Sequence, residues 1–356
     1  LHNGEQAYPA MLEAIARSSR TAWLSTYIFD TDATGRAFID ALAAAAARGV
    51  DVRVIVDGIG EKYSRPRAAR LLASRGVQVS RFLPPRLLRP NLHMNLRDHR
   101  KLLLLDGALG FTGGMNIGDR HLADRPDNPR RVVDLQFRVE GPVVAHMERV
   151  FLQDWAFVTG RAAEACSPPP VAVGTAACRG VADGPNEDFD RLMWILHGAI
   201  AAARERLVLL TPYFIPDRPL ITAIVAAALR GVRVDVILPG KNNLPYCHWA
   251  TRHLLWELLA HGVRVWYQPP PFVHSKLILV DEAYALIGSA NVDSRSLRLN
   301  FEFDLEVVDR GFNAELSAHV ERCLEVSRPV TRDELDARPL PERVRDALAR
   351  LASPYL

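Results

Sequence analysis

The stretch His99–Asp106, "HRKLLLLD", returns at His274–Asp281 as "HSKLILVD". Each copy has a His, a Lys two residues later and an Asp seven residues after the His, and Leu, Ile or Val fill most of the remaining positions. A short apolar run of this kind is typical of a buried strand. Alternate side chains of a strand share a face, so we expect the His and the Lys of each copy to lie together on one face.

The repeat extends outward from the motif. "ALAAAAARGVDVRVIVDG" precedes the first copy and "AIVAAALRGVRVDVILPG" precedes the second, at corresponding places in a longer duplicated unit. In both halves an Ala-rich amphipathic helix ends in Arg-Gly and leads into a strand rich in β-branched residues. Helices that alternate with short apolar strands predict an α/β fold of two similar lobes, each with a mixed central β-sheet flanked by helices.

The limits of the repeat predict the domain organisation. We expect a first lobe at 1–165, a linker at 166–185 rich in Pro, Gly and Ala, and a second lobe at 186–330. Residues 331–356 are expected to form a basic amphipathic helix that carries Val344, Leu348 and Leu351 on one face. Packing of this helix, with its basic face outward, is favoured over insertion into a membrane.

Composition limits the function classes. The 356 residues suit two lobes, and 49% hydrophobic and 24% charged residues exclude disorder. A net charge of +3 is too small for wholesale coating of nucleic acid. The four Cys have no C-x-x-C spacing, which favours neither a zinc site nor a disulfide framework. No apolar run approaches a membrane span, although the first residue is Leu, so an N-terminal anchor ahead of it stays open.

The repeated residues suit the chemistry of a phosphate ester. An imidazole can act as nucleophile or acid, and a neighbouring ammonium can stabilise charge on phosphoryl oxygens. After each motif a bend of small residues leads to an Asn, and here Gly114 and Ser289 would allow a ligand close to the backbone while Asn116 and Asn291 donate to it. A lone H-x-K would be a weak signal, but two copies with matching flanks favour a catalytic site.

These motifs resemble the phospholipase D superfamily, whose signature is H-x-K-x-x-x-x-D followed by Gly-Gly or Gly-Ser and Asn. Segments such as "YIFDTDATGRAF", "FTGGMNIGDRH" and "TPYFIPD" are similar to the bacterial cardiolipin synthase branch. The resemblance implies lobes packed with pseudo-twofold symmetry, so that both His–Lys pairs serve one cleft. It also implies a phosphohistidine formed on His99, with His274 as acid and base, although the reverse order stays open.

The resemblance also implies a role for each site residue, without a metal or another cofactor. The catalytic set is His99, Lys101, Asp106, His274, Lys276 and Asp281. The phosphate-binding set is Asn116, Asn291, Gly114 and Ser289. Asp106 and Asp281 fall nominally on the opposite strand face, so we expect them to support a turn. Asp134 and Glu302, each on a strand after its motif, are implied as the acceptors that orient the histidines.

The function implied is a phosphatidyltransferase that makes cardiolipin from phosphatidylglycerol and a second phospholipid or polyol. A phospholipase D-type hydrolase and a superfamily nuclease stay open as alternatives, whereas a non-catalytic scaffold would not need two such motifs. Expected partners are phosphatidylglycerol, with phosphatidylethanolamine as a second candidate, and an anionic membrane met peripherally on the cytoplasmic side of the bacterial cell membrane. Nucleic acid is not expected as a partner.

Two further stretches bear on membrane contact. "RFLPPRLLRP" at 81–90 could dip Phe82, Leu83, Leu87 and Leu88 into a bilayer while its arginines meet lipid phosphates, or could be a Pro-stiffened loop packed on protein. Within 243–263, Trp249 and Trp256 recur at helical spacing with leucines, and a place in the core is favoured for this stripe over a role in ligand binding.

Overall fold

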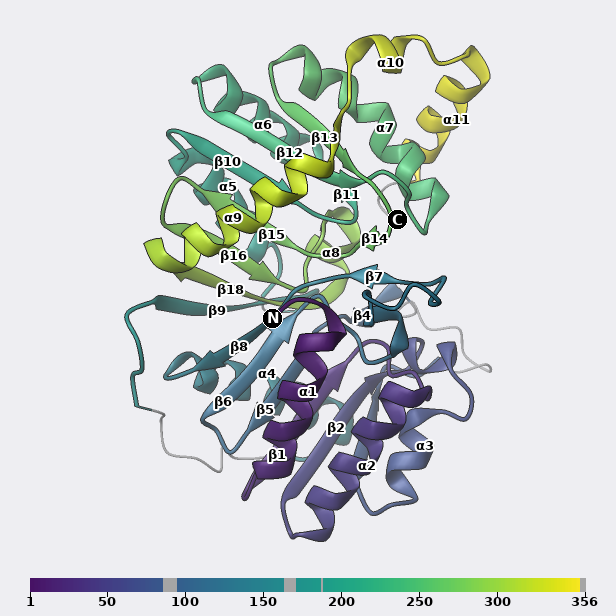
Figure 1. The fold of residues 1–356 in the computed structure, drawn as a ribbon, viewed down its shortest axis with the longest axis vertical. Coiled ribbons are helices and arrows are strands. Elements are labelled where there is room, and N and C mark those ends of the chain that lie inside the picture. Colours follow the sequence, from purple (N-terminus) through teal and green to yellow (C-terminus); the bar gives the residue numbers. More distant parts are fainter. Residues whose placement is uncertain (86–94, 163–170, 187, 353–356) are drawn as a thin grey trace. The chain divides into compact units, whose positions relative to one another are not determined.

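The computed structural model describes residues 1–85, 95–162, 171–186 and 188–352. The chain forms two compact units (Figure 1). The first comprises residues 1–175 and 300–304, and the second comprises residues 176–299 and 305–356. The lobe and linker boundaries expected from the sequence remain a prediction.

The first unit alternates helices and strands as the sequence predicts. Its elements are α1 (Asn3–Arg17), β1 (Thr21–Thr26), α2 (Ala33–Ala47), β2 (Asp51–Asp57), the 3-10 helix η1 (Gly60–Tyr63), α3 (Ala68–Ala73), β3 (Gln78–Phe82), β4 (Arg97–Asp98), β5 (Leu102–Leu105), β6 (Leu109–Gly113), the 3-10 helix η3 (Asp119–His121), β7 (Val132–Val133), β8 (Gln136–Glu140) and α4 (Val143–Thr159).

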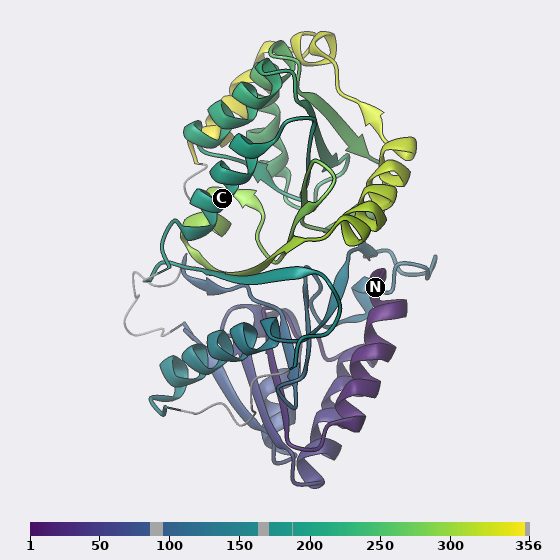
Figure 2. The same ribbon diagram turned by 90° about the vertical axis from the view of Figure 1, so that its left-hand side faces the viewer.

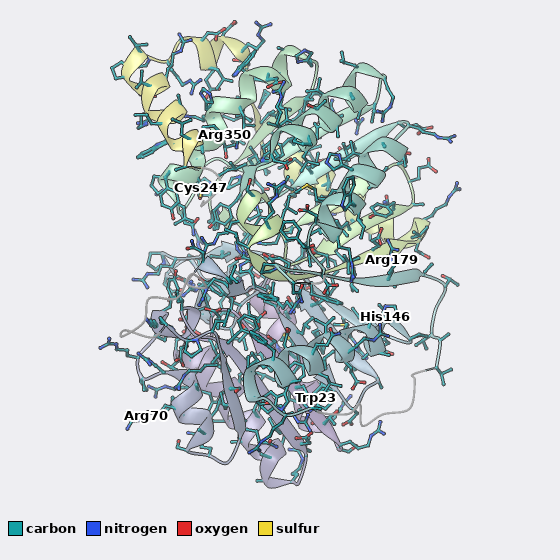
Figure 3. All side chains as sticks on the ribbon, turned by 180° about the vertical axis from the view of Figure 1, so that it is seen from behind. Trp23, Arg70, His146, Arg179, Cys247 and Arg350 are labelled. Carbon is teal, nitrogen blue, oxygen red and sulfur yellow. The ribbon has the colours of Figure 1, made fainter. Side chains whose placement is uncertain are left out.

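Six of these strands form a mixed sheet in the order β3-β2-β1-β5-β6-β8. Strands β1, β2 and β3 are parallel neighbours, joined through α2 and α3, whereas β5, β6 and β8 pair antiparallel. Strands β1 and β5 are buried at every position because helices cover both faces of the sheet. Figure 2 shows α4 on the face opposite α1. On the α4 side, the fully buried ring of Trp23 (labelled in Figure 3) stacks on Phe151.

The second unit repeats this plan and extends it. Its elements are β9 (Ala177–Asp183), α5 (Arg191–Ala202), β10 (Arg206–Leu210), β11 (Phe214–Ile215), α6 (Arg218–Leu229), β12 (Arg233–Pro239), α7 (Pro245–Ala260), β13 (Arg264–Gln268), β14 (Phe272–Val273), β15 (Leu277–Val280), β16 (Tyr284–Gly288), β17 (Val292–Asp293), α8 (Ser294–Arg298), β18 (Asn300–Val308), α9 (Arg310–Val326), β19 (Arg328–Pro329), α10 (Arg332–Asp336) and α11 (Leu340–Leu351).

The strand order of the second unit, β13-β12-β10-β15-β16-β18, matches that of the first. Its first three strands are again parallel, and β15 and β16 again pair antiparallel. A core of apolar side chains from α5, α6 and α7 packs on one face of this sheet. Figures 1 and 2 show α9 across the other face. The prediction of an α/β fold with two similar lobes is therefore confirmed.

Three local expectations need correction. The H-x-K residues do not lie within a strand: β4 ends at Asp98 and β5 begins at Leu102, because β4 pairs with β18 while β5 pairs with β1. The segment expected to be a linker contains β9, which pairs with β18. Residues 331–352 form two helices, α10 and α11, rather than one, because Pro339 follows the first and allows the second to begin afresh.

Three stretches of the sequence prediction lie partly outside the described residues, and one of them is the expected linker, of which 166–170 are not described. Arg86, Leu87, Leu88 and Arg89 of the proposed membrane loop also lie outside the described residues, as do the last four residues of the chain. Of the same loop, Phe82 is described and is fully buried at the end of β3, where its ring meets Phe301 edge to face. That contact favours packing on protein for this side chain.

Candidate active site

The first motif histidine is fixed by the beginning of β18, whose residues 300–304 belong to the first unit. Strand β4 pairs in parallel with it, so that Arg97 lies beside Asn300 and Asp98 beside Phe301. One residue further, the backbone N–H of His99 donates to the carbonyl of Phe301 at 2.9 Å. His99 therefore lies in the break between β4 and β5, and its backbone N–H is held by β18.

Glu302 then meets the imidazole itself. Its Oε2 lies 3.0 Å from Nδ1 of His99, and its carboxylate is fully buried. The amide of Asn300 donates to Oε1 of the same carboxylate at 3.0 Å. A buried carboxylate on Nδ1 fixes the tautomer and leaves Nε2 as the reactive nitrogen. Chain order would assign Glu302 to the second motif, and the structure instead places it on the first.

Lys101 lies on the other side of the histidine. Its Nζ donates to the carbonyl of His99 at 2.5 Å, and it sits 5.8 Å from the ring centre of Tyr27, which in turn packs edge-on against the imidazole. Burial lowers the pKa of Lys101 to about 8, against the opposing charges of Glu302 and Asp98. This ammonium is therefore poorly hydrated and would gain by meeting a phosphoryl oxygen.

Asn116 follows the motif on the bend after β6. Its Oδ1 accepts from the backbone N–H of Ile28 at 3.0 Å, and the side chain is buried. With the carbonyl end used in this way, the amide nitrogen is the end that can donate to a ligand. This geometry suits the role expected of Asn116.

Gly114 and Asp134 lie against each other. A Cβ on Gly114 would come within 2.5 Å of Oδ1 of Asp134, so glycine is required to admit that buried carboxylate. The same Oδ1 accepts from the N–H of Leu135 at 2.8 Å. The charge of Asp134 also acts to raise the pKa of Lys101. Gly114 is thus explained by the space that the carboxylate of Asp134 needs. The sequence alone did not suggest that these two residues are neighbours.

The Asp of each motif binds backbone. Both residues have positive φ, and Asp106 accepts from the N–H groups of Ser19, Arg20 and Thr21 at the start of β1. In the second unit, Asp281 accepts in the same way from the backbone N–H groups of Arg204, Glu205 and Arg206 at the start of β10. Although burial opposes it, these N–H groups hold the pKa of Asp106 and of Asp281 below its usual range. Such contacts make each Asp a clamp between neighbouring strands.

The second motif carries the same backbone contact in different surroundings. His274 and Lys276 lie between β14 and β15, and Nζ of Lys276 donates to the carbonyl of His274 at 2.5 Å. The amide N–H of Asn291 donates a hydrogen bond to Oγ of Ser296 at 3.1 Å. The buried Oδ1 of Asn291 has no hydrogen-bond partner among the described residues. Ser289 is fully buried at the end of the preceding bend.

A buried charge network behind His99 is a feature that sequence reasoning missed. Arg100, the residue between the motif His and Lys, is 2% exposed and makes a bidentate ion pair at 2.6 Å with Asp154 of α4. Its Nε donates to the carbonyl of Glu302 at 3.0 Å. An Arg beside a run of apolar residues in the sequence is the signal that could have revealed such a partner, since a buried guanidinium must be paired.

The described residues contain no group of three or more His, Cys, Asp or Glu side chains arranged to hold a metal ion. Within the same part of the chain, no helix has the length and hydropathy needed to cross a bilayer. At the first motif, an imidazole oriented by a carboxylate lies beside a buried ammonium.

Comparison with known proteins agrees with this chemistry. Residues 11–155 and 196–324 match the family model described as "Cardiolipin synthase, PLD-like domain". The chain belongs to this family, a branch of the phospholipase D superfamily. It is 33% identical over 357 residues to cardiolipin synthase A of Pseudomonas putida, a match that covers all of this chain and 74% of that protein.

Two further relatives extend the comparison. The major cardiolipin synthase ClsA of Bacillus subtilis is 32% identical over 358 residues, covering 99% of this chain and 74% of the other. Among solved structures, phosphatidylserine synthase of Haemophilus influenzae matches with a TM-score of 0.74 at 15% identity, over all of this chain and 94% of that one. At that identity the structural match bears on the fold alone.

Proposed function

We propose that this chain is a phosphatidyltransferase that makes cardiolipin from phosphatidylglycerol and a second phospholipid, through a phosphohistidine, and that a polyol can replace the second phospholipid as acceptor of the phosphatidyl group. The observation that carries the proposal is the contact between His99 Nδ1 and the buried carboxylate of Glu302. It supports a histidine whose Nε2 is free to attack phosphorus. The cardiolipin synthases to which the chain is similar along its whole length support the choice of substrate.

The first step would be attack of His99 Nε2 on the phosphorus of the donor lipid. The Nδ1 proton stays on the bond to Glu302, so the imidazole gains positive charge as the N–P bond forms, beside a fixed carboxylate. Lys101 and the amide of Asn116 would hold the non-bridging oxygens. Their burial excludes water and strengthens that interaction.

The leaving alcohol needs a proton, and the incoming alcohol must lose one. The second motif offers His274 for both tasks, with Lys276, Ser289 and Asn291 beside it in sequence, as the family resemblance implies. Trapping distinguishes the two orders of the histidines. If His99 is the nucleophile, His274→Ala should accumulate a phosphatidyl group on His99, detected by peptide mass spectrometry. A phosphatidyl group on His274 in His99→Ala would reverse the assignment.

Transfer and hydrolysis share this intermediate and differ in the acceptor. The names of the relatives favour transfer. A phospholipase D-type hydrolase is the second candidate because water could replace the acceptor alcohol. We further propose peripheral attachment to an anionic membrane on the cytoplasmic side of the bacterial cell membrane, where the phospholipid substrates are present.

Lipid product analysis tests the proposal. Purified full-length chain is incubated with phosphatidylglycerol vesicles, with and without phosphatidylethanolamine or glycerol, and the products are read by mass spectrometry beside His99→Ala. Cardiolipin from the unaltered chain but not from the variant is expected. Phosphatidic acid as the main product would establish hydrolysis instead, and the absence of any lipid product would contradict the proposal and direct the search to nucleic-acid diesters.

A further inference from the structure

Helix α11 displays the side of the helix that globular proteins usually bury. Leu340, Val344, Leu348 and Leu351 recur every three or four residues along it, and they are 70%, 49%, 61% and 77% exposed. The sequence led us to expect this stripe against the protein, and the structure turns it outward. Trp256 of the neighbouring helix α7, expected in the core, is also 53% exposed.

The outward orientation is fixed by charges on the opposite face of α11. Asp346 is fully buried and accepts hydrogen bonds from Arg252 of α7, from Arg338 and from Arg345. Arg350, labelled in Figure 3, donates to the carbonyl of Pro216. Turning the apolar stripe inward would move the buried carboxylate away from Arg252 and Arg338, which do not belong to α11, and that separation is costly. The display of leucine is therefore built into the packing of the helix.

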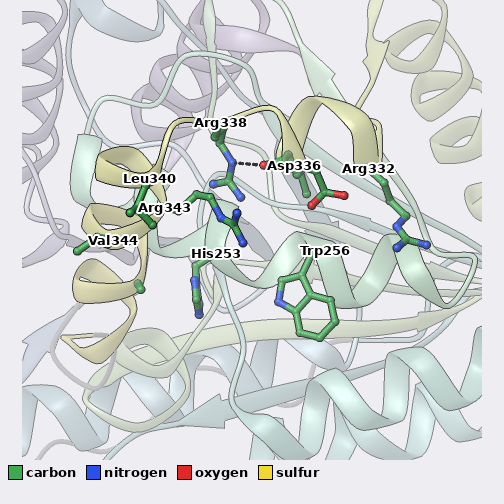
Figure 4. Close-up of a pocket in the computed structure, with 10 residues that line it drawn as sticks. His253, Trp256, Arg332, Asp336, Arg338, Leu340, Arg343 and Val344 are labelled. Carbon is green, nitrogen blue, oxygen red and sulfur yellow. Dashed lines mark hydrogen bonds between the residues drawn. The ribbon is translucent and has the colours of Figure 1, made fainter.

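Cationic groups lie beside the stripe. A pocket of about 490 Å³ between α7, α10 and α11 is lined by Leu340 and Val344 of the stripe, Trp256 and three arginines, among other residues (Figure 4). Arg338 is engaged by Asp346, whereas Arg332 and Arg343 have no ion-pair partner among the described residues.

The balance of charge in this pocket is positive. Asp336 is the one carboxylate among its lining residues. His253 also lines the pocket. Burial and the charges of Arg350 and Arg338 lower the pKa of His253, and this favours the neutral form of its imidazole. The pocket therefore offers cations next to exposed apolar side chains.

The combination of exposed apolar side chains and neighbouring cations favours an anionic bilayer over a second copy of the chain as the partner of this surface. A helix that presents leucines beside a tryptophan, with arginines at the border, is suited to the boundary between acyl chains and anionic headgroups. A second copy of the chain, docked through the same patch by twofold symmetry, would bring the arginines of one copy against those of the other. An anionic bilayer meets both the apolar and the cationic part of the surface.

We propose that the stripe of α11, with Trp256, Arg332 and Arg343, is a docking surface for a bilayer that contains anionic phospholipid. The leucines enter the interface between headgroups and acyl chains, and the two arginines meet lipid phosphates. This surface is separate from the motif histidines, so it can hold whether or not the proposed reaction does.

Vesicle flotation of the full chain tests the surface. Vesicles of phosphatidylglycerol mixed with phosphatidylcholine are compared with vesicles of phosphatidylcholine alone. The variant Leu348→Ser/Leu351→Ser should bind the mixed vesicles at least tenfold more weakly, because two apolar side chains no longer enter the bilayer. Leu229→Ser, at a residue of α6 that is 69% exposed, is the matched control and should bind normally.

The arginines are tested by Arg332→Ala/Arg343→Ala, which should lose about fivefold in affinity per arginine for the mixed vesicles. Arg70→Ala/Arg322→Ala, at two exposed arginines on α3 and α9, is the control and should bind normally. Undiminished binding by either test variant would overturn the proposal. So would a change of oligomeric state by light scattering without a change in vesicle binding.

His99→Ala separates this proposal from the proposed reaction. That variant should make no cardiolipin and still float with the mixed vesicles. A chain that floats but yields no lipid product even when unaltered would contradict the proposed reaction and leave the docking surface standing.

Discussion

Between its His and its Lys the first motif has Arg100, and the second has Ser275. Arg100 is tied to Asp154 and to the backbone of Glu302, whereas the buried hydroxyl of Ser275 has no hydrogen-bond partner among the described residues. One contact is the same in both motifs, since the motif Lys donates to the carbonyl of its own His. Duplication thus kept the reacting groups and changed what lies behind them.

The largest effect should come from Glu302→Gln. An amide on Nδ1 of His99 no longer stabilises the imidazolium and can fix the wrong tautomer, so kcat should fall by about 10²- to 10⁴-fold. Steady-state assay of cardiolipin formation measures this. The matched control is Glu306→Gln, on the same strand but paired with Arg179, and it should retain activity. Unchanged kcat in Glu302→Gln would contradict the role of Glu302 in orienting His99 and stabilising its imidazolium.

Arg100→Met should destabilise the chain by about 3–5 kcal/mol, because it leaves the carboxylate of Asp154 without its buried partner. Ser275→Ala should change stability by less than about 1 kcal/mol, since its hydroxyl makes no bond that would be lost. Urea unfolding followed by circular dichroism measures both. Arg100→Met/Asp154→Leu should recover part of the loss, and equal costs at the two positions would contradict the comparison.

The fall in kcat/KM at alkaline pH should come from the deprotonation of Lys101 in the first motif. Lys101 must be protonated to stabilise phosphoryl oxygens, and with its pKa lowered to about 8 it loses its proton as pH rises through that value. We therefore expect kcat/KM to fall about tenfold per pH unit above about 8. Lys101→Arg, though less active, should shift this fall to higher pH because guanidinium stays charged. If Lys276→Arg shifted it instead, the assignment to Lys101 would be wrong.

The smallest difference is expected between the motif aspartates. Asp106→Ala and Asp281→Ala each lose hydrogen bonds to three backbone N–H groups, and each should cost about 1–3 kcal/mol. Thermal unfolding measures the two losses, which should agree within about 1 kcal/mol. Loss of activity without loss of stability in either variant would indicate contact with substrate instead of a clamp between strands.

The pattern of residues supports the family and carries the prediction of which side chains react. Two H-x-K-x-x-x-x-D motifs with matching flanks cannot easily come from packing alone, and the helix and strand periods around them predict the alternating helices and strands that both units share. Spacing also allowed the prediction that Asp106 and Asp281 support a turn. Both properties depend on local sequence, where the period of the side chains carries the information.

Partners distant in sequence were beyond this reasoning. Glu302 lies 203 residues from His99 and reaches it because β18 pairs with β4, a two-residue strand too short to show a period. The orientation of α11 was likewise predicted wrongly, because its apolar stripe suggested burial, and the ion pairs of Asp346 overrule that pattern.

The amino-acid sequence by itself therefore determined the fold class and the family, and it carries the prediction of the reacting groups, since all three follow from repeated local patterns. The tertiary structure decided which carboxylate orients His99, why Arg100 can be buried and which face of α11 meets solvent. Each of these depends on pairing between groups far apart in the chain, where the cost of burying an unpaired charge selects the partner.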